Sequence, residues 1–104
     1  MINVEKISGI GEFEKKVVKN DESNKNVVQF FVGERAFLIE NPHTIEVRTD
    51  EKLKKVLVEK YESVMESRYF GRGGIEIVVE GKQLDYSEIE DLVRLSYNLT
   101  KEKE

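Results

Sequence analysis

The apolar and polar positions in the first half of the chain predict a series of antiparallel strands. Two apolar runs, at residues 27–32 and 36–39, are joined across Gly33-Glu34. Glycine supplies the positive φ that a type II′ turn requires, so these runs predict a β-hairpin. Residues 44–48 alternate strictly, which predicts a strand with one buried face. An earlier strand is expected at residues 13–19.

The second half of the chain has two stretches with apolar residues at helical spacing. The first helix is expected at residues 50–67, with Thr49 as its N-cap. The second is expected at residues 86–100, because Asp85 and Glu88 have the spacing of a capping box. A strand is expected between them at residues 75–79. The two apolar stripes comprise Leu53, Val56, Leu57, Tyr61, Val64 and Met65, then Ile89, Leu92, Val93 and Leu99 with Ser96 among them.

This order of elements predicts an α+β two-layer sandwich in a single domain, residues 1–104. An antiparallel sheet of four to six strands would carry both main helices on one face. Residues 1–12 are expected to form an arm or a short helix, and residues 20–26 a mobile, solvated loop. Residues 101–104 are expected to be a frayed tail.

Composition narrows the classes of function. Hydrophobic residues make up 38% and charged residues 37% of the chain, with a formal net charge of −4. An acidic domain repels phosphate at long range, which counts against a general nucleic-acid binder. With no cysteine and one histidine, no disulfide, metal set or cofactor is expected. No apolar run approaches 18 residues and no signal core is present, so a cytoplasmic protein without membrane contact is expected.

Part of the chain resembles a known family. The residues that carry the likeness are Phe30 to Leu38, Thr44 to Glu51, Leu57, Tyr61, Gly81 and, most closely, Ile89 to Leu99. Over residues 27–100 the chain resembles the MmcQ/YjbR-like small α/β proteins. The resemblance implies a two-layer fold like that of secretion chaperones or frataxin, and a nucleic-acid role has been suggested for the family. Gly73-Gly74 replaces the family's Trp with its basic neighbours, and only Arg72 keeps a positive charge.

The glycine-rich segment 68–74 is the sharpest candidate for a binding site. Arginine forks and free backbone N–H groups suit a phosphate, and aromatic rings suit stacked bases. The candidate ligand-binding residues are Arg68, Tyr69, Arg72, Gly73 and Gly74, with Lys15, Lys16 and Lys19 as expected neighbours. The alternative is a structural connection whose Tyr69 and Phe70 fill the core.

Other polar residues have simpler interpretations. His43 follows a proline in a turn and has no second histidine or cysteine with which to share a metal. Ser96 lacks a nearby base, so we expect it to bond back to its own helix. We expect Glu46, Glu76 and Glu80 to face outward. There they would form a solvent-exposed face of the sheet or a charged edge that prevents association with another sheet.

Two functions remain open from the sequence. Val28, Phe31 and Val78 fall outside the expected core pattern, so they predict an interaction face on the sheet. That face favours a non-catalytic interaction module that forms a homodimer or binds a protein partner. The alternative is a nucleic-acid-binding module that uses segment 68–74. No nucleophile–base pair supports an enzyme.

Overall fold

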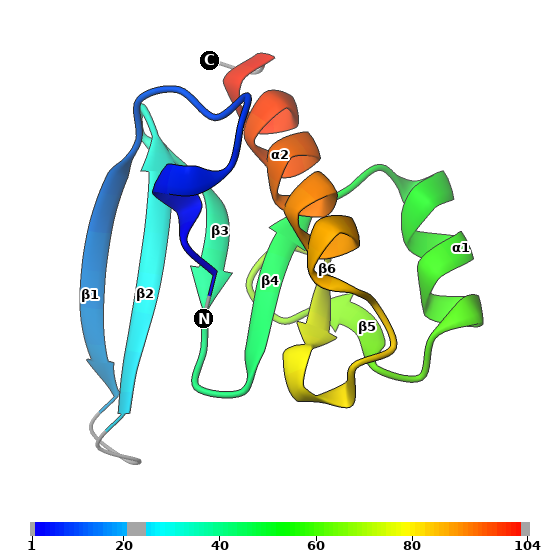
Figure 1. Cartoon of the computed structure of the whole chain (residues 1–104). Coiled ribbons are helices and arrows are strands. Elements are labelled where there is room, and N and C mark those ends of the chain that lie inside the picture. The colour runs from blue at the N-terminus through cyan, green and yellow to red at the C-terminus, as the bar shows by residue number, and fades with distance from the viewer. Residues whose placement is uncertain (1, 21–24, 103–104) are drawn as a thin grey trace.

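The computed structural model describes residues 2–20 and 25–102 and shows a six-stranded antiparallel sheet with two helices (Figure 1). The strand order is β1-β2-β3-β4-β6-β5, so β1 and β5 are the edge strands. The predicted α+β class is confirmed. The elements are β1 Glu14–Asn20, β2 Lys25–Val32, β3 Arg35–Glu40, β4 Thr44–Arg48, α1 Glu51–Lys60, β5 Val64–Ser67, β6 Gly71–Val78 and α2 Tyr86–Glu102.

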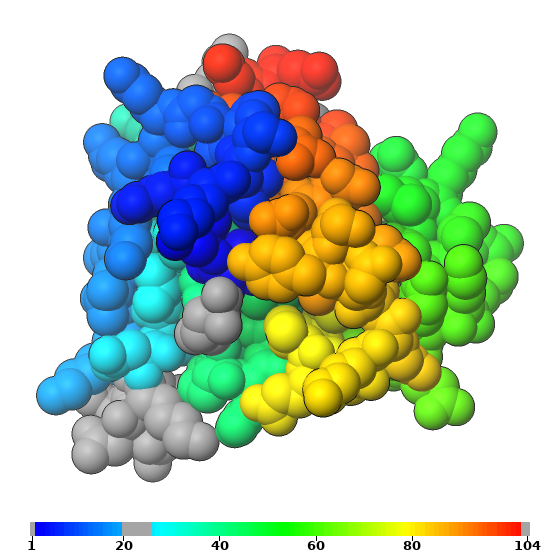
Figure 2. Space-filling view, viewed as in Figure 1, coloured from blue at the N-terminus to red at the C-terminus, as the bar shows by residue number. Residues whose placement is uncertain are grey.

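Both helices lie on the same side of the sheet. Helix α2 crosses the middle strands β3 and β4, whereas α1 packs over β5 and β6 (Figure 1). The N-terminal arm lies beside α2 on this side (Figure 2). The core lies between these layers, and its sheet side chains include Ile45 and Val47 on β4 and Ile75 and Ile77 on β6. We call the opposite side of the sheet the back face.

The N-terminal arm belongs to the core. Ile2, Val4 and Ile7 are all buried, and a single 3-10 turn occupies Val4–Lys6. The arm is tied to α2 because the Tyr97 hydroxyl donates to the carbonyl of Glu12 at 3.1 Å. The segment thus contains a single 3-10 turn and packs against the rest of the core.

A β-bulge in β3 adds an aromatic ring to the core. Phe30 pairs with Leu38 and Phe31 with Ala36, so Phe37 is the extra residue. Phe37 and Leu38 are both fully buried, although neighbours in a regular strand face opposite sides. The ring of Phe37 contacts the rings of Phe13, Phe30 and Tyr97 on the helix side.

The predicted first helix is wrong over its C-terminal part. Helix α1 ends at Lys60, and the predicted helical residues 64–67 form strand β5 instead. Val64 pairs with Ile77, so burial against β6 outweighs the helical spacing. Asp50, not Thr49, is the N-cap, because its carboxylate accepts from the Leu53 N–H at 2.7 Å. Val56, expected in the buried stripe, is 56% exposed.

The second helix follows its sequence signals. The Asp85 carboxylate accepts from the Glu88 N–H at 2.8 Å, and Leu84 and Ile89 of the hydrophobic staple are buried. The helix runs to Glu102, so the first two residues of the predicted tail are helical. In the predicted loop 20–26, Asn20 ends β1 and Lys25 begins β2, while residues 21–24 lie outside the described part.

Candidate functional site

Segment 68–70 folds over the back face and is held there by Arg68. The Arg68 guanidinium donates two hydrogen bonds to the Glu76 carboxylate, from Nε to Oε1 at 2.9 Å and from a terminal nitrogen to Oε2 at 2.7 Å. This two-point geometry is the strongest form of arginine–carboxylate pairing. The charge of the predicted phosphate ligand Arg68 is therefore already met by the chain itself.

A second carboxylate, Glu46, holds the same segment. Its Oε1 accepts from the Ser67 hydroxyl and from the Tyr69 N–H, each at 2.8 Å. Its Oε2 accepts from the Asn41 side-chain amide at 2.8 Å. Glu46 lies directly opposite Glu76 on neighbouring strands, so the two carboxylates anchor adjacent parts of the turn.

The expectation that Glu46 and Glu76 face water is wrong. Both point to the back face as predicted, but they are only 3% and 2% exposed because segment 68–70 covers them. Burial raises the pKa of Glu76, but hydrogen bonds from Arg68 and Thr44 outweigh it, so the pKa lies below the ordinary value of 4.5. The third predicted outward carboxylate, Glu80, is exposed.

Of the two glycines in the predicted site, Gly74 has a structural role and Gly73 does not, and the neighbouring Gly71 also has one. Gly71 has a φ of +60°, which favours glycine at the turn into β6. Gly74 is packed so tightly that a Cβ there would lie 2.4 Å from the Val47 carbonyl oxygen and 2.8 Å from the Phe70 Cβ. Gly73 has more room, because an added Cβ would meet only the Phe70 carbonyl oxygen at 3.6 Å.

The aromatic residues of the segment differ in exposure. Phe70 is half-buried beneath the Arg48 guanidinium, which lies 4.7 Å from the ring centre. Tyr69 is 49% exposed and packs edge-on against Phe70. Neither ring belongs to the core that the structural alternative expects them to fill: Phe70 packs on the back face, and Tyr69 faces solvent.

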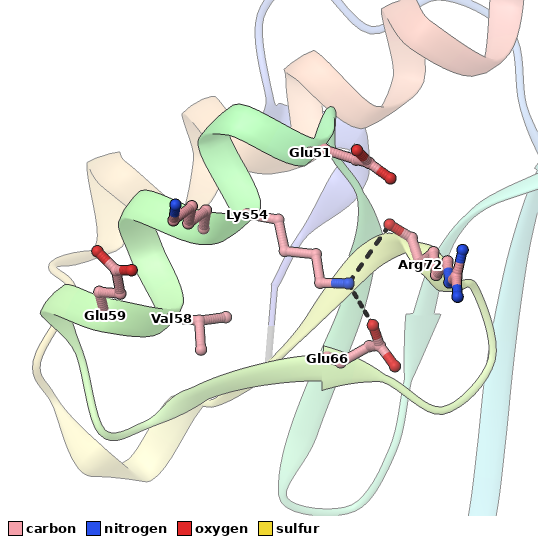
Figure 3. A pocket seen from close by; sticks show the side chains of 7 residues that line it. Glu51, Lys54, Val58, Glu59, Glu66 and Arg72 are labelled. Atoms are coloured by element: carbon pink, nitrogen blue, oxygen red, sulfur yellow. Dashed lines mark hydrogen bonds and ion pairs between the residues drawn. The ribbon is translucent and has the colours of Figure 1, made fainter.

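Arg72 borders a groove between α1 and the β5–β6 pair (Figure 3). Lys54 crosses this groove, where its ammonium group pairs with Glu66 and approaches the Arg72 carbonyl oxygen at 3.5 Å. The groove has equal numbers of acidic and basic side chains: Glu51, Glu59 and Glu66 against Lys54, Lys55 and Arg72. It has no net charge with which to select an anion.

The structure does not bring Val28, Phe31 and Val78 together on one face. Val28 on β2 lies in the same row of paired residues as Ile77 on β6, through Glu40 on β3 and Ile45 on β4. Its side chain packs against the core on the helix side. Phe31 and Val78 are half-buried and lie several strands apart, on β2 and β6. The predicted interaction face fails because alternate residues of a strand face opposite sides, and Val28 has the parity of the core.

Ser96 connects α2 to the sheet rather than to its own helix. Its hydroxyl donates to the Phe37 carbonyl and accepts from the Arg48 N–H at 2.8 Å. Both groups lie one residue beyond Leu38 and Val47, the last pair in the β3–β4 register. The bond back along α2 comes instead from Thr100 to the Ser96 carbonyl. His43 is an exposed turn residue, as expected, and lies 2.9 Å from Glu80.

The lysines expected beside segment 68–74 lie at the other end of the sheet. Lys15, Lys16 and Lys19 are on edge strand β1, whereas segment 68–74 leads into β6, four strands away. All three lysines are exposed, and Val17 between them is 54% exposed. Sequence reasoning identified the strand but not its edge position, which depends on the strand order of the whole sheet.

Comparison with known proteins adds no assignment. No protein-family model, curated protein or solved structure matches the chain. Across residues 2–20 and 25–102, no three His, Asp or Glu side chains are grouped so as to hold a metal ion. No helix in that part of the chain is long and apolar enough to cross a bilayer. The likeness to the MmcQ/YjbR-like family stays a prediction.

Proposed function

We propose that the protein is an interaction module that binds an extended, acidic segment of a protein partner along the free edge of β1. The supporting observation is the edge itself. Strand β1 has seven residues and pairs only with β2 among the residues described. An unpaired edge presents a row of backbone N–H and C=O groups that can bond to an added strand.

Edge β1 is more open than edge β5. Strand β5 has four residues and lies against α1. By contrast, within residues 2–20 and 25–102 the main helix–strand contacts are those of α2 with β2, β3 and β4 and those of α1 with β5 and β6. The exposed Val17 on β1 offers apolar contact beside the backbone groups. A partner strand at β1 therefore meets less steric obstruction and a longer row of bonding groups.

The charge on β1 favours an acidic partner over a second copy. The strand carries three lysines and one glutamate. If two copies of β1 paired antiparallel about Val17, Lys15 of each copy would lie opposite Lys19 of the other, which gives two lysine–lysine pairs. Like charges directly opposite each other destabilise a strand pair. An extended segment with glutamate or aspartate opposite the lysines has the complementary charge.

Nucleic acid remains the alternative ligand and has weaker support. The proposed phosphate ligand Arg68 is paired with Glu76, and the three lysines lie far from segment 68–74 in the strand order. The net charge of −4 also opposes a polyanion at long range. An acidic protein segment differs because backbone pairing contributes to its binding in addition to charge.

Calorimetric titration with synthetic peptides tests the proposal. The probe is a blocked seven-residue peptide of alternating glutamate and valine, and its two controls carry lysine for glutamate or N-methyl groups on alternate backbone nitrogens. We expect binding of the probe only. Lys15 and Lys19 lie on the same face of β1, so the glutamates of the probe can oppose both. Exchanging Lys15→Glu and Lys19→Glu together should weaken binding about thirtyfold, because each exchange replaces an attraction of about 0.5 kcal/mol by a repulsion of similar size.

The matched control carries Lys52→Glu and Lys55→Glu on α1, which changes net charge equally at exposed positions away from β1. This variant should bind the probe like the wild type. Equal weakening in both variants would show a non-specific charge effect and would refute the β1 site. Binding of a single-stranded oligothymidylate at β1 with higher affinity than the peptide would replace the proposal by the nucleic-acid alternative.

A further inference from the structure

A shallow groove between the two helices is lined by leucines. Its apolar residues are Leu53 and Leu57 on α1, Leu92 and Leu95 on α2, and Leu84 before α2. The space that they border is about 320 Å³. We call this the leucine groove. It lies on the helix side, whereas the β1 edge lies at the far end of the sheet.

Helix α1 is incompletely covered in the isolated chain. None of its residues is fully buried, and its apolar side chains Leu53 and Leu57 are only half-buried. Val56, which follows Leu53 by three positions and so lies beside it on the helix surface, is 56% exposed. A ten-residue helix depends on tertiary packing for most of its stability, and α1 receives that packing on one flank only.

The two flanks of the leucine groove carry opposite charges. Glu88 and Asp91 border it on the α2 side. On the α1 side, Lys60 follows Leu57 by three positions and Val56 by four, which places it on the same flank as both. Glu59 follows Val56 by three positions and also lies near this flank, and Asp91 is paired with Arg94 at 2.6 Å. The charges that can complement each other across the leucines are therefore Glu88 on the α2 side and Lys60 on the α1 side.

We infer that this surface is a two-fold interface at which α1 of each copy packs against the leucine groove of the other. A two-fold interface requires a surface that is complementary to itself. Opposite charges on the two rims meet that requirement, because the axis brings Lys60 of each copy to Glu88 of the other. A partner helix of uniform charge would meet one rim favourably and be repelled by the other.

The area that a stable dimer must bury indicates which residues this interface would include. A standard interface buries about 800 Å² on each copy, against a total surface of 6678 Å² for this domain. The leucine groove alone is too small for that area, so the exposed outer side of α1 must be included. Val56 then lies within the interface.

Sedimentation equilibrium over micromolar to millimolar concentrations tests this inference. We expect the wild type to form a reversible dimer. The dissociation constant of Val56→Asp should be higher by about tenfold or more, because the two-fold symmetry places two carboxylates in the apolar contact. Val17→Asp on β1 is the matched control, since Val17 is 54% exposed and Val56 is 56% exposed. This control should dimerise like the wild type.

Charge exchange then tests the orientation. Lys60→Glu should weaken the dimer, and adding Glu88→Lys to the same chain should restore it. A wild type that stays monomeric at millimolar concentration would refute the inference. A dimer that persists in Val56→Asp, or that Val17→Asp dissociates equally, would place the contact elsewhere and also refute it. Circular dichroism of each variant confirms that it is folded, and a partly unfolded Val56→Asp is replaced by Leu95→Glu with the same expected result.

Discussion

At the scale of single residues, the best-defined feature is the pair of buried carboxylates on the back face. Buried acidic groups need partners, and Glu46 and Glu76 obtain them from segment 67–69 and from β4. The sequence signals identified segment 68–74 as unusual because of its arginines, aromatics and glycines. They could not show that Arg68 would be engaged by Glu76, because the strand pairing that brings these residues together is a tertiary property.

The close packing of Gly74 leads to a stability prediction. Gly74→Ala should destabilise the protein by about 1–3 kcal/mol, because the new methyl group would overlap the Val47 carbonyl and the Phe70 side chain. Gly73→Ala, where the added group has 3.6 Å of clearance, should change stability by less than about 1 kcal/mol. Urea denaturation of both variants measures the difference, and equal effects would contradict the observed packing.

The pKa of Glu76 leads to a prediction about pH. Because its folded-state pKa is lowered from 4.5, the unfolded chain takes up this proton first as the pH falls. The stabilisation is therefore present above pH 4.5 and is lost as the pH falls towards the folded-state pKa. Glu76→Gln should lower the free energy of unfolding by about 2 kcal/mol at neutral pH. The difference in this free energy between the variant and the wild type should become smaller as the pH falls.

The control for this prediction is Glu62→Gln, since Glu62 is exposed. Denaturation midpoints of the three proteins across the acid range provide the measurement. A Glu76→Gln deficit that stays constant at every pH would show that Glu76 contributes by shape or neutral hydrogen bonding and not by its charge.

At the scale of elements, the boundary between α1 and β5 is where sequence reasoning failed. Val64 and Met65 continue the apolar spacing of the helix, and no glycine or proline ends it before Gly71. The strand forms because Val64 is buried against Ile77, a contact between residues 13 positions apart. Helix α2 was placed correctly because its start is encoded locally by Asp85 and Glu88.

The connection of α2 to the sheet through Ser96 gives an element-level prediction. Ser96→Ala should destabilise the protein by about 1–3 kcal/mol, because it leaves the Arg48 N–H without its hydrogen bond in a buried place. Asn98→Ala, at an exposed position of the same helix, should have an effect below about 0.5 kcal/mol. Chemical denaturation of the two variants decides, and a neutral Ser96→Ala would refute the role of this contact.

At the scale of the whole molecule, charge is distributed unevenly along the sheet. The domain carries a net charge of −4, yet its β1 edge carries three exposed lysines. No sequence pattern could reveal this edge, because edge position follows from the order β1-β2-β3-β4-β6-β5. The same strand order explains why the predicted group of lysines and segment 68–74 does not form.

The exposed position of these lysines predicts a salt-dependent interaction. Binding of the glutamate–valine peptide should weaken steadily as sodium chloride is raised, because ions screen exposed charges beyond about 8 Å at physiological ionic strength. Calorimetric titrations at several salt concentrations measure the slope. The Lys15→Glu, Lys19→Glu variant should show a smaller slope than the wild type, and identical slopes would mean that these lysines do not contact the peptide.

Hydrogen exchange of backbone amides, followed by NMR, tests the central claim that β1 is an open edge for strand addition. In the free protein, the β1 amides that point away from β2 should exchange quickly, and those bonded to β2 slowly. Adding the glutamate–valine peptide should protect the outward amides of residues 14–20 while leaving residues 68–74 unchanged. Outward β1 amides that are already protected in the free protein, or protection that appears at residues 68–74 instead, would contradict the account.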